Sequence, residues 1–315
     1  MEVRTEVTHH ENITEEIIKG LGETPKRLPT KLFYDEMGSQ LFDQICELDE
    51  YYPTRTELKI LEENIDEIVA SIGEEGMLLE LGSGSSLKTR LLLDYLPNLS
   101  AYVPVDISSD HLVKSAETLK FDYPALPIYP LVADYTKPFT LPEIFESYKT
   151  VDAFYPGSSI GNFTPDKAKE FLEKIAETCG SDSSLLIGVD LKKEENILNK
   201  AYNDNKGVTA KFNLNILNHI NNLTNADFDL NKFSHLAFYN ESVSRIEMYL
   251  VSREDQRICF NGKEIFIEKN EQVLTEYSYK YSLDDFEELV KDIYKIENVW
   301  TDKNNLFSVQ FFRAL

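Results

Sequence analysis

Two glycines and a preceding carboxylate, in the segment Glu80-Leu81-Gly82-Ser83-Gly84, are the first residues of this chain whose types and spacing point to chemistry. Glycines let a chain turn tightly and approach a ligand closely, and the first turn of a following helix offers free backbone N–H groups. Asp106 lies 22 residues after Gly84, where a carboxylate can accept both ribose hydroxyls of an adenosine. The segment therefore predicts a loop that binds a nucleotide-like cofactor.

The spacing of these glycines separates two classes of cofactor. A dinucleotide fingerprint places a third glycine where this chain has Leu87. Glu-x-Gly-x-Gly instead resembles the first motif of class I methyltransferases, whose cofactor carries a sulfonium and an amino-acid group. Asp134-Tyr135 offers a carboxylate for the adenine amine and a ring for stacking. We expect S-adenosylmethionine as cofactor and S-adenosylhomocysteine as product; a glycine-rich turn without a ligand is the competing interpretation.

The elements that must position these residues follow a βαβ pattern between about residues 77 and 192, where short apolar runs alternate with helical patterns. Strands are predicted at 77–84 with its turn, 101–108, up to 134, 152–160 and 184–191, and helices at 86–96, 112–121 and from Thr164-Pro165 onward. The glycine loop, Asp106 and Asp134 then fall at the ends of three strands.

The pattern changes after residue 192. An Asn-rich helical stretch from Glu194 to about Asn231 precedes alternating strands, and Asn261-Gly262 between two apolar runs predicts a tight hairpin. A capping box at 282–285 opens a last helix, and 306–315 reads as a buried strand. We predict an α/β fold: a Rossmann-like class I methyltransferase sheet with a second, smaller α+β substrate-binding domain. The first domain takes residues 57–192 and 282–315, and the second takes residues 1–56 and 193–281.

Composition excludes several classes of function. A formal net charge of -23 disfavours nucleic acid and anionic membranes, because nucleic-acid binding depends on clustered Lys and Arg. No apolar run approaches the length of a membrane span, and the 3 cysteines and 5 histidines show no metal-ligand spacing. We expect a cytoplasmic protein, acting as a monomer on a small molecule without a metal.

Seven stretches in order along the chain carry a closer resemblance. They are LFYDEMGSQLFDQI (32–45), EYYPTRTE (50–57), LLELGSGSSLKTRLLL (78–93), GSSIGNFTP (157–165), AYNDNKGVTAKFN (201–213), RIEMYL (245–250) and LTEYSYKY (274–281). Together they resemble the histidine-specific Nα-methyltransferase family of ergothioneine biosynthesis, which converts L-histidine to hercynine. The resemblance implies a Rossmann-like methyltransferase domain joined to a smaller substrate domain.

The resemblance also assigns residue roles. The implied cofactor contacts are Tyr34, Gly82, Lys88, Asp106, Asp134 and Tyr135. The implied substrate contacts are Phe42, Tyr51, Gly157, Asn162, Tyr202, Met248, Glu276 and Ser278. Asn162 and Tyr34 are the residues expected to act in catalysis. Glu276 and Ser278 share one strand face and suit the two imidazole nitrogens, while Tyr52 is the alternative to Tyr51 under a one-residue shift.

The predicted reaction is three in-line transfers of a methyl group to a neutral amine, in which positioning supplies most of the acceleration. No histidine stands out as a base, so the proton is expected to leave to water, with the amine oriented by Asn162 and a nearby phenol. Aromatic faces from Tyr34 and Phe42 suit the methylated ammonium. The alternatives are an N-methyltransferase of another aromatic amino acid, such as tryptophan or a prenylated derivative, and a non-catalytic protein that binds S-adenosylmethionine.

Overall fold

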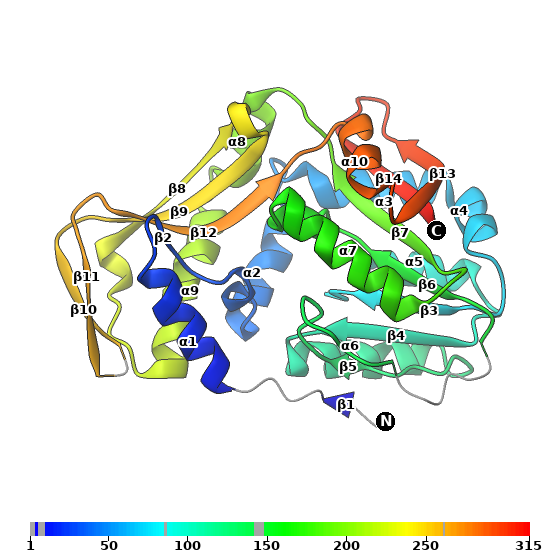
Figure 1. The fold of residues 1–315 in the computed structure, drawn as a ribbon, viewed down its shortest axis with the longest axis horizontal. Coiled ribbons are helices and arrows are strands. Elements are labelled where there is room, and N and C mark those ends of the chain that lie inside the picture. The colour runs from blue at the N-terminus through cyan, green and yellow to red at the C-terminus, as the bar shows by residue number, and fades with distance from the viewer. Residues whose placement is uncertain (1–3, 6–9, 85–86, 142–147, 261) are drawn as a thin grey trace. The chain divides into compact units, whose positions relative to one another are not determined.

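The computed structural model of the chain describes residues 4–5, 10–84, 87–141, 148–260 and 262–315 (Figure 1). Its contacts divide the chain into two compact units: unit 1 comprises Met1–Val7, Pro53–Lys192 and Tyr279–Leu315, and unit 2 comprises Thr8–Tyr52 and Lys193–Ser278. The predicted domain bounds at 57 and 282 therefore move to Pro53 and Tyr279, and the N-terminal strand joins unit 1. That the first unit binds cofactor and the second binds substrate stays a prediction.

Unit 1 contains an eight-stranded sheet among the described residues, in the order β1-β5-β4-β3-β6-β7-β14-β13. Its strands are β1 (Arg4–Thr5), β3 (Met77–Leu81), β4 (Ala101–Asp106), β5 (Leu131–Val132), β6 (Val151–Tyr155), β7 (Ser184–Asp190), β13 (Tyr294–Thr301) and β14 (Phe307–Ala314). The strands from β5 to β7 pair in parallel, whereas β14 runs antiparallel to both β7 and β13. This order, with one reversed strand near the edge, is the sheet of class I methyltransferases and confirms the predicted α/β fold.

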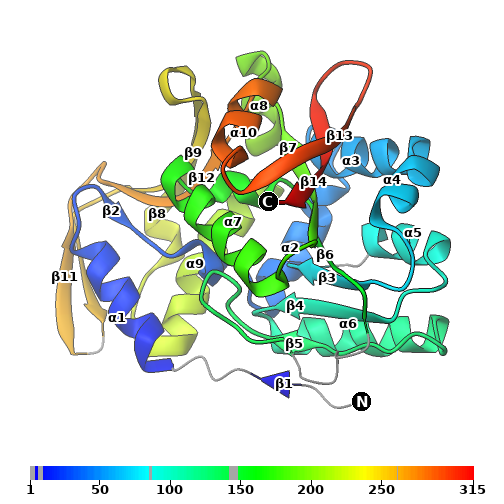
Figure 2. The ribbon, with the colours of Figure 1, turned by 45° about the vertical axis from the view of Figure 1, so that its right-hand side comes forward.

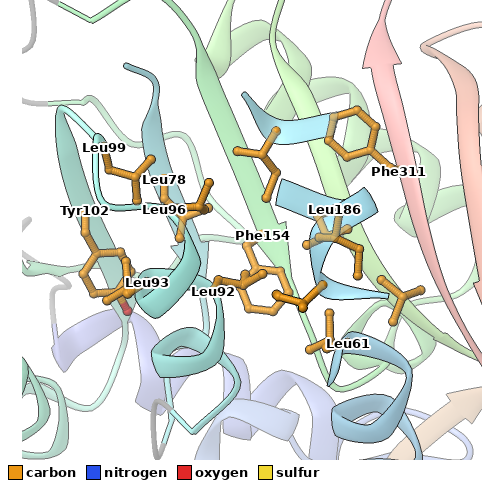
Figure 3. Close-up of a cluster of buried hydrophobic side chains, with 14 of the residues drawn as sticks. Leu61, Leu78, Leu92, Leu93, Leu96, Leu99, Tyr102, Phe154, Leu186 and Phe311 are labelled. Atoms are coloured by element: carbon orange, nitrogen blue, oxygen red, sulfur yellow. The ribbon is translucent and has the colours of Figure 1, made fainter. Parts of the chain in front are cut away.

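Helices cover both faces of this sheet (Figures 1 and 2). They are α3 (Tyr52–Glu63), α4 (Ile65–Ile72), α5 (Leu87–Tyr95), α6 (Ser109–Asp122), α7 (Pro165–Cys179) and α10 (Leu283–Val290). On one face, leucines of α5 pack with Leu78, Tyr102 and Phe154 from three neighbouring strands (Figure 3). On the other face Phe171 of α7 contacts Tyr155. Burial on both faces explains why the central strands are apolar throughout.

The helix starts follow local chemistry. Ser282 and Asp285 form the predicted capping box, in which each side chain accepts the other's backbone N–H. Pro165 occupies the first turn of α7, and Thr164 stands at its N-cap. Thr164 makes no side-chain cap hydrogen bond, so the predicted cap at this helix rests on proline alone.

Unit 2 combines helices with a four-stranded sheet in the order β2-β12-β9-β8 among its described residues. The strands of this sheet are β2 (Lys26–Arg27), β8 (Phe233–Asn240), β9 (Arg245–Ser252) and β12 (Gln272–Tyr279). A separate two-stranded sheet consists of β10 (Gln256–Phe260) and β11 (Lys263–Ile267). The helices are α1 (His10–Leu21), α2 (Glu36–Cys46), α8 (Glu195–Tyr202) and α9 (Val208–Thr224). Short 3₁₀ segments are η1 (Thr30–Phe33), η4 (Leu230–Lys232) and η5 (Glu241–Val243). Helix α9 packs against α2, β8 and β9 (Figure 1).

Two strand predictions need comment. The strand predicted at 152–160 was wrong beyond Tyr155: β6 ends there, because Pro156 lacks an N–H and both Gly157 and Ser158 adopt positive φ. The predicted hairpin is confirmed as antiparallel β10 and β11, with Phe260 opposite Lys263. Its first turn residue, Asn261, lies outside the described residues, as does Ser86 at the predicted start of α5.

The described residues contain neither a candidate membrane span nor a candidate metal cluster. No helix there has the length and apolar character that a membrane crossing requires. No group of three or more His, Cys, Asp or Glu side chains within the described ranges is placed to hold a metal ion.

Candidate active site

The glycine loop of unit 1 leaves β3 through residues in the left-handed region. Gly82 has φ +76° and its N–H donates to the Val105 carbonyl at 2.8 Å, which ties the loop to β4. Gly84 has φ +44°. A Cβ at Gly82 would lie 3.4 Å from the Tyr135 hydroxyl oxygen. The positive φ therefore favours glycine at position 82, whereas the Tyr135 hydroxyl would be in ordinary contact with a Cβ there. Residues 85–86, which follow the motif, lie outside the described part of the chain.

Glu80, the carboxylate of the motif, is 1% exposed and belongs to the scaffold. The hydroxyl of Thr89 on α5 donates to it at 2.6 Å, and the hydroxyl of Tyr102 on β4 donates to its other oxygen. Burial raises the pKa of Glu80 to about 7. The carboxylate thus ties β3 to the helix that follows the loop, and both its oxygens are occupied by protein donors.

The predicted adenosine contacts stand at neighbouring strand ends. Asp106 closes β4, accepts the Ser108 N–H at 2.9 Å, and has its pKa raised by burial. The Ala133 N–H donates to the Asp106 carbonyl at 3.0 Å, which places Asp134 and Tyr135 beside it. Asp134 is 8% exposed and accepts the Thr136 N–H at 3.2 Å. The structure therefore brings Gly82, Asp106, Asp134 and Tyr135 together at one edge of the sheet.

Lys88 in the first turn of α5 is paired with a carboxylate that the sequence prediction did not include. Its ammonium contacts Glu57 of α3, whose side chain is fully buried. The Gly157 N–H donates to both Glu57 oxygens, at 3.0 and 2.9 Å. Gly157 has φ +80°, and its N–H is consumed by this contact. A substrate contact at Gly157 would therefore use its carbonyl or its lack of a side chain.

Asn162 ends the 3₁₀ segment η3 (Ser159–Asn162), which follows the Gly157-Ser158 turn. The Gly161 N–H donates to the Ser158 carbonyl at 2.9 Å, and the Ser158 hydroxyl accepts the Asp190 N–H from β7 at 2.9 Å. Gly157 and Asn162, both predicted substrate contacts, thus belong to unit 1 with Gly82, Lys88 and the other predicted cofactor contacts of that unit.

Tyr34, the remaining predicted cofactor contact, belongs to unit 2.

Unit 2 holds a chain of aromatic rings. Ring centroids are 6.1 Å apart for Tyr34 and Phe42, 6.3 Å for Phe42 and Tyr51, and 6.4 Å for Tyr51 and Tyr202. All three pairs meet edge to face, the geometry that aromatic quadrupoles prefer. Phe212 of α9 supports the row at 5.9 Å from Phe42. Three predicted site residues that are close in the sequence therefore have Tyr202, more than a hundred positions further along the chain, as a neighbour.

The segment around Tyr34 is shaped by its own motif. Asp35 caps α2 by accepting the Gly38 N–H at 2.7 Å, and it also accepts the Asn215 side-chain amide at 2.8 Å. A Cβ at Gly38 would lie 1.7 Å from the Phe33 carbonyl oxygen, so only glycine fits. These contacts hold Tyr34 between η1 and α2.

The remaining predicted substrate residues lie on β9 and β12. The Tyr202 hydroxyl donates to the Ser278 hydroxyl at 2.9 Å, and Ser278 is 4% exposed. Glu276 raises the pKa of Tyr51 further, beyond the larger effect of burial and the effect of Tyr202. Met248 is 2% exposed, and its carbonyl accepts the Thr275 hydroxyl at 3.1 Å. Tyr51, Tyr202 and Ser278 thus lie together within unit 2, and the Glu276 charge acts on the Tyr51 pKa.

Tyr51 and Tyr52 have different surroundings. Tyr51 joins the aromatic row, and burial holds its pKa well above its ordinary value, so its phenol stays protonated. The Tyr52 hydroxyl accepts from Lys193 at 2.6 Å, and that ammonium lies 4.6 Å from the ring centroid. The geometry groups Tyr51, and not Tyr52, with Tyr202 and Glu276.

Sequence reasoning missed two supporting residues. Glu57 ends the quoted EYYPTRTE stretch, and that position was its only signal. His235 of β8 bonds the Tyr202 carbonyl through Nε2 at 3.0 Å and the Asn213 amide through Nδ1 at 2.9 Å. The same amide nitrogen donates to the Tyr249 carbonyl, so Nδ1 must accept, and burial lowers the His235 pKa. A neutral histidine therefore supports the end of α8, and nothing in its sequence neighbourhood marked it.

Comparison with known proteins identifies the family. The family described as "Histidine-specific methyltransferase, SAM-dependent" matches residues 13–314. The chain belongs to this family. A histidine N-alpha-methyltransferase of Mycolicibacterium smegmatis is 40% identical over 93% of this chain and 92% of its own length. The protein of that name from Mycobacterium tuberculosis is also 40% identical, over 86% of this chain and 85% of its own length.

More distant matches include another N-methyltransferase and a solved structure of similar fold. A 4-dimethylallyltryptophan N-methyltransferase of Aspergillus fumigatus is 26% identical over 86% of this chain and 84% of its own. A solved structure described as a candidate methyltransferase from Thermobifida fusca has a TM-score of 0.50 and covers 94% of this chain and 97% of its own, at 13% identity. At that identity the structural likeness speaks for the fold alone.

Proposed function

We propose that this member of the histidine-specific methyltransferase family transfers three methyl groups from S-adenosylmethionine to the α-amino nitrogen of L-histidine, giving hercynine, the first step of ergothioneine biosynthesis. The observation that carries the proposal is the 40% identity to two histidine N-alpha-methyltransferases along almost the whole of each chain. S-adenosylhomocysteine is the other product, and the chemistry needs no metal.

The chemistry of unit 1 suits the cofactor. Asp106 can accept the ribose hydroxyls, Asp134 can accept the adenine amine, and the glycine at position 82 lets the backbone come close to a ligand. When bound, the cofactor supplies the sulfonium methyl group. Lys88 retains donors beyond its contact with Glu57, and these can meet the methionine carboxylate.

The chemistry of unit 2 suits an aromatic amino acid with a basic ring. Glu276 can accept an imidazole N–H, and the Ser278 hydroxyl can donate or accept. The row of Tyr34, Phe42 and Tyr51 offers ring faces to a methylated ammonium. These features support L-histidine as substrate.

The amine must lose a proton before each transfer, because only its neutral form has a lone pair for in-line attack. Tyr51 is held protonated by burial, so it can orient the amine as a hydrogen-bond partner but cannot take the proton. His235 bonds a backbone carbonyl and an amide through its two ring nitrogens, and His219 Nδ1 lies 2.8 Å from the Leu32 carbonyl oxygen. We therefore assign the proton to water and the positioning of the amine to Asn162 and a phenol.

The test is mass spectrometry of L-histidine incubated with purified protein and S-adenosylmethionine. Products carrying one, two and three added methyl groups are expected, ending in the trimethylated betaine. Unmodified histidine, from protein that demonstrably binds S-adenosylmethionine, would refute the substrate. Binding of both ligands without any methylated product would instead support a non-catalytic protein.

Asn162→Ala tests the assigned positioning residue. The variant should methylate histidine about a hundredfold more slowly, because a small misplacement of the amine is costly, while its affinity for S-adenosylmethionine changes little. Turnover close to that of the wild type would remove Asn162 from the mechanism.

The 4-dimethylallyltryptophan N-methyltransferase relative supports a second candidate substrate class, tryptophan and its prenylated derivatives. Glu276 is the discriminating residue, since a carboxylate suits an imidazole N–H and a larger indole favours a smaller residue. In a competition assay histidine should outcompete tryptophan, and the reverse order would overturn the choice of histidine.

A further inference from the structure

Glu57 is a buried carboxylate that does not belong to the predicted site residues. Its side chain is 0% exposed, on α3 near the start of unit 1. A carboxylate without contact to water is costly unless it is both paired with a cation and hydrogen-bonded. Its position inside the unit therefore requires partners that hold its charge.

Glu57 finds those partners in two other segments of unit 1. The Lys88 ammonium, on the first turn after the glycine loop, contacts one carboxylate oxygen. The Gly157 N–H donates to both oxygens, at 3.0 and 2.9 Å. The Lys88 side chain keeps 15% of its surface exposed, so the pair is buried at its acidic end and open at its basic end.

The backbone of β7 is shaped to admit this carboxylate. A Cβ at Gly188 would lie 2.0 Å from the Glu57 Oε1 atom and 2.8 Å from its Cδ atom, so no side chain fits there. The carboxylate thus lies against three segments: β7, the Gly157 turn and α5. Gly157 and Ser158 both have positive φ, and the turn they form leads to Asn162. One side chain therefore links the glycine-loop helix to the segment that carries Asn162.

We infer that Glu57 is a positioning residue for the amino-acid end of the cofactor: it holds the Lys88 ammonium in one orientation and fixes the Gly157 turn beside it. Lys88 has three N–H donors, and its contact with Glu57 leaves the others for an external carboxylate. The adenosine end is assigned to other residues, Asp106 and Asp134, which accept the Ser108 and Thr136 N–H groups. The inference rests on the proposed binding of S-adenosylmethionine in unit 1.

The experiment compares two ligands in the same protein. S-adenosylhomocysteine carries the amino-acid end, whereas 5′-methylthioadenosine lacks it. In Glu57→Gln the dissociation constant for S-adenosylhomocysteine should rise about tenfold or more, the effect of losing one oriented charged contact, while that for methylthioadenosine changes less than about threefold. A merely structural role would weaken both ligands alike, and that result would overturn the inference.

Asp152→Asn is the matched control. Asp152 is also a buried carboxylate of unit 1, 1% exposed, but it lies at the other end of β6 and accepts the Thr150 hydroxyl at 3.1 Å. Its substitution should leave the ratio of the two dissociation constants unchanged. Glu57→Asp, which keeps the charge with a shorter reach, should fold more readily than Glu57→Gln and show an intermediate loss of discrimination.

Lys88→Met completes a double-mutant cycle. If Glu57 acts through Lys88, Glu57→Gln causes no further loss of discrimination in the Lys88→Met background. An undiminished effect there would contradict the inference. A wild-type protein that binds neither ligand would refute the proposed function. If the wild type prefers S-adenosylhomocysteine to methylthioadenosine and Glu57→Gln shows the same preference, only the role of Glu57 is refuted.

Discussion

The predicted site residues of unit 1 are held by backbone turns and buried charges, whereas those of unit 2 are held by ring packing and neutral hydrogen bonds. In unit 1, Gly82 and Gly157 adopt positive φ, and the carboxylates of Glu57 and Glu80 are buried with protein donors. In unit 2, Tyr34, Phe42 and Tyr51 pack edge to face. The two regions therefore respond to different changes: loss of a charge in unit 1, and loss of a ring or hydroxyl in unit 2.

The difference suits the chemistry proposed for each region. A charged cofactor with a fixed shape can be bound by rigid turns and oriented charges, at which reorganisation is small. A substrate whose amine gains methyl groups changes in size and charge at each step, and ring faces tolerate such change better than a fixed ion pair. Substitutions that remove a charge in unit 1 or a hydrogen-bonding group in unit 2 test the comparison.

The largest expected effect is on the buried ion pair of unit 1. Lys280 Nζ lies 2.7 Å from Asp190 Oδ2 at the end of β7, and both side chains are 1% exposed. Lys280→Met removes the ammonium that faces the buried Asp190 carboxylate, so the free energy of unfolding in urea titrations should fall by about 3–5 kcal/mol. The exposed pair of Lys167 with Glu170 is the control, and Lys167→Met should change the urea midpoint far less than Lys280→Met does, because solvent screens an exposed pair. Equal effects of the two substitutions would show that buried charge does not stabilise unit 1.

Glu80 should make the stability of the protein depend on pH. Burial raises its pKa to about 7, so the folded protein keeps the proton that the unfolded chain releases near pH 4.5. Its contribution to stability is therefore full at low pH and falls as pH rises through this window. Glutamine does not titrate. From pH 5 to pH 8, the free energy of unfolding of Glu80→Gln, measured in urea, should therefore rise by roughly 2–3 kcal/mol relative to that of the wild type. A constant difference between the two proteins would contradict the assignment.

Tyr51 and Tyr52 provide a matched pair for unit 2. Tyr51→Phe removes a hydroxyl next to Tyr202 and Glu276, and kcat/KM for histidine should fall about tenfold, the value of one hydrogen bond. Tyr52→Phe removes a hydroxyl bonded to Lys193, and kcat/KM should change less than about twofold. Steady-state kinetics of both variants measure these effects. A larger loss in Tyr52→Phe than in Tyr51→Phe would show that Tyr52, and not Tyr51, contacts the substrate.

The sequence predicted the parts of unit 1 that are local in the chain. The glycine loop, Asp106 and Asp134 each follow a short apolar run, so their placement at strand ends needed only the βαβ pattern. The end of β6 could also have been predicted, because Pro156-Gly157 is a turn signal. The predicted strand extended past it. The contacts of Glu57 could not be predicted, since its partners lie 31 and 100 residues away and only the fold brings them together.

Unit 2 could be predicted only through the family resemblance. Tyr34, Tyr202 and Ser278 come from three distant segments, and each alone has the composition of ordinary core. Edge-to-face packing and the Tyr202 to Ser278 hydrogen bond depend on tertiary placement, which no periodicity encodes. The ion pair of Lys280 and Asp190 was not predicted for the same reason, because in the sequence a buried ion pair cannot be distinguished from two surface charges.

The smallest expected effect is the titration of His235, and its sign is opposite to that of Glu80. Burial lowers the His235 pKa, and protonation would place a proton on Nδ1 where it accepts from the Asn213 amide. The stability it contributes is full above the unfolded pKa near 6.5 and is lost as pH falls toward the lower folded pKa. His235→Gln can bond both the Tyr202 carbonyl and the Asn213 amide without titrating, so its urea midpoint should fall less steeply from pH 7 to pH 5 than that of the wild type. Parallel slopes in the two proteins would mean that the neutral hydrogen bonds of unit 2 do not carry this pH dependence, and that the contrast with the buried carboxylates of unit 1 is weaker than the contacts indicate.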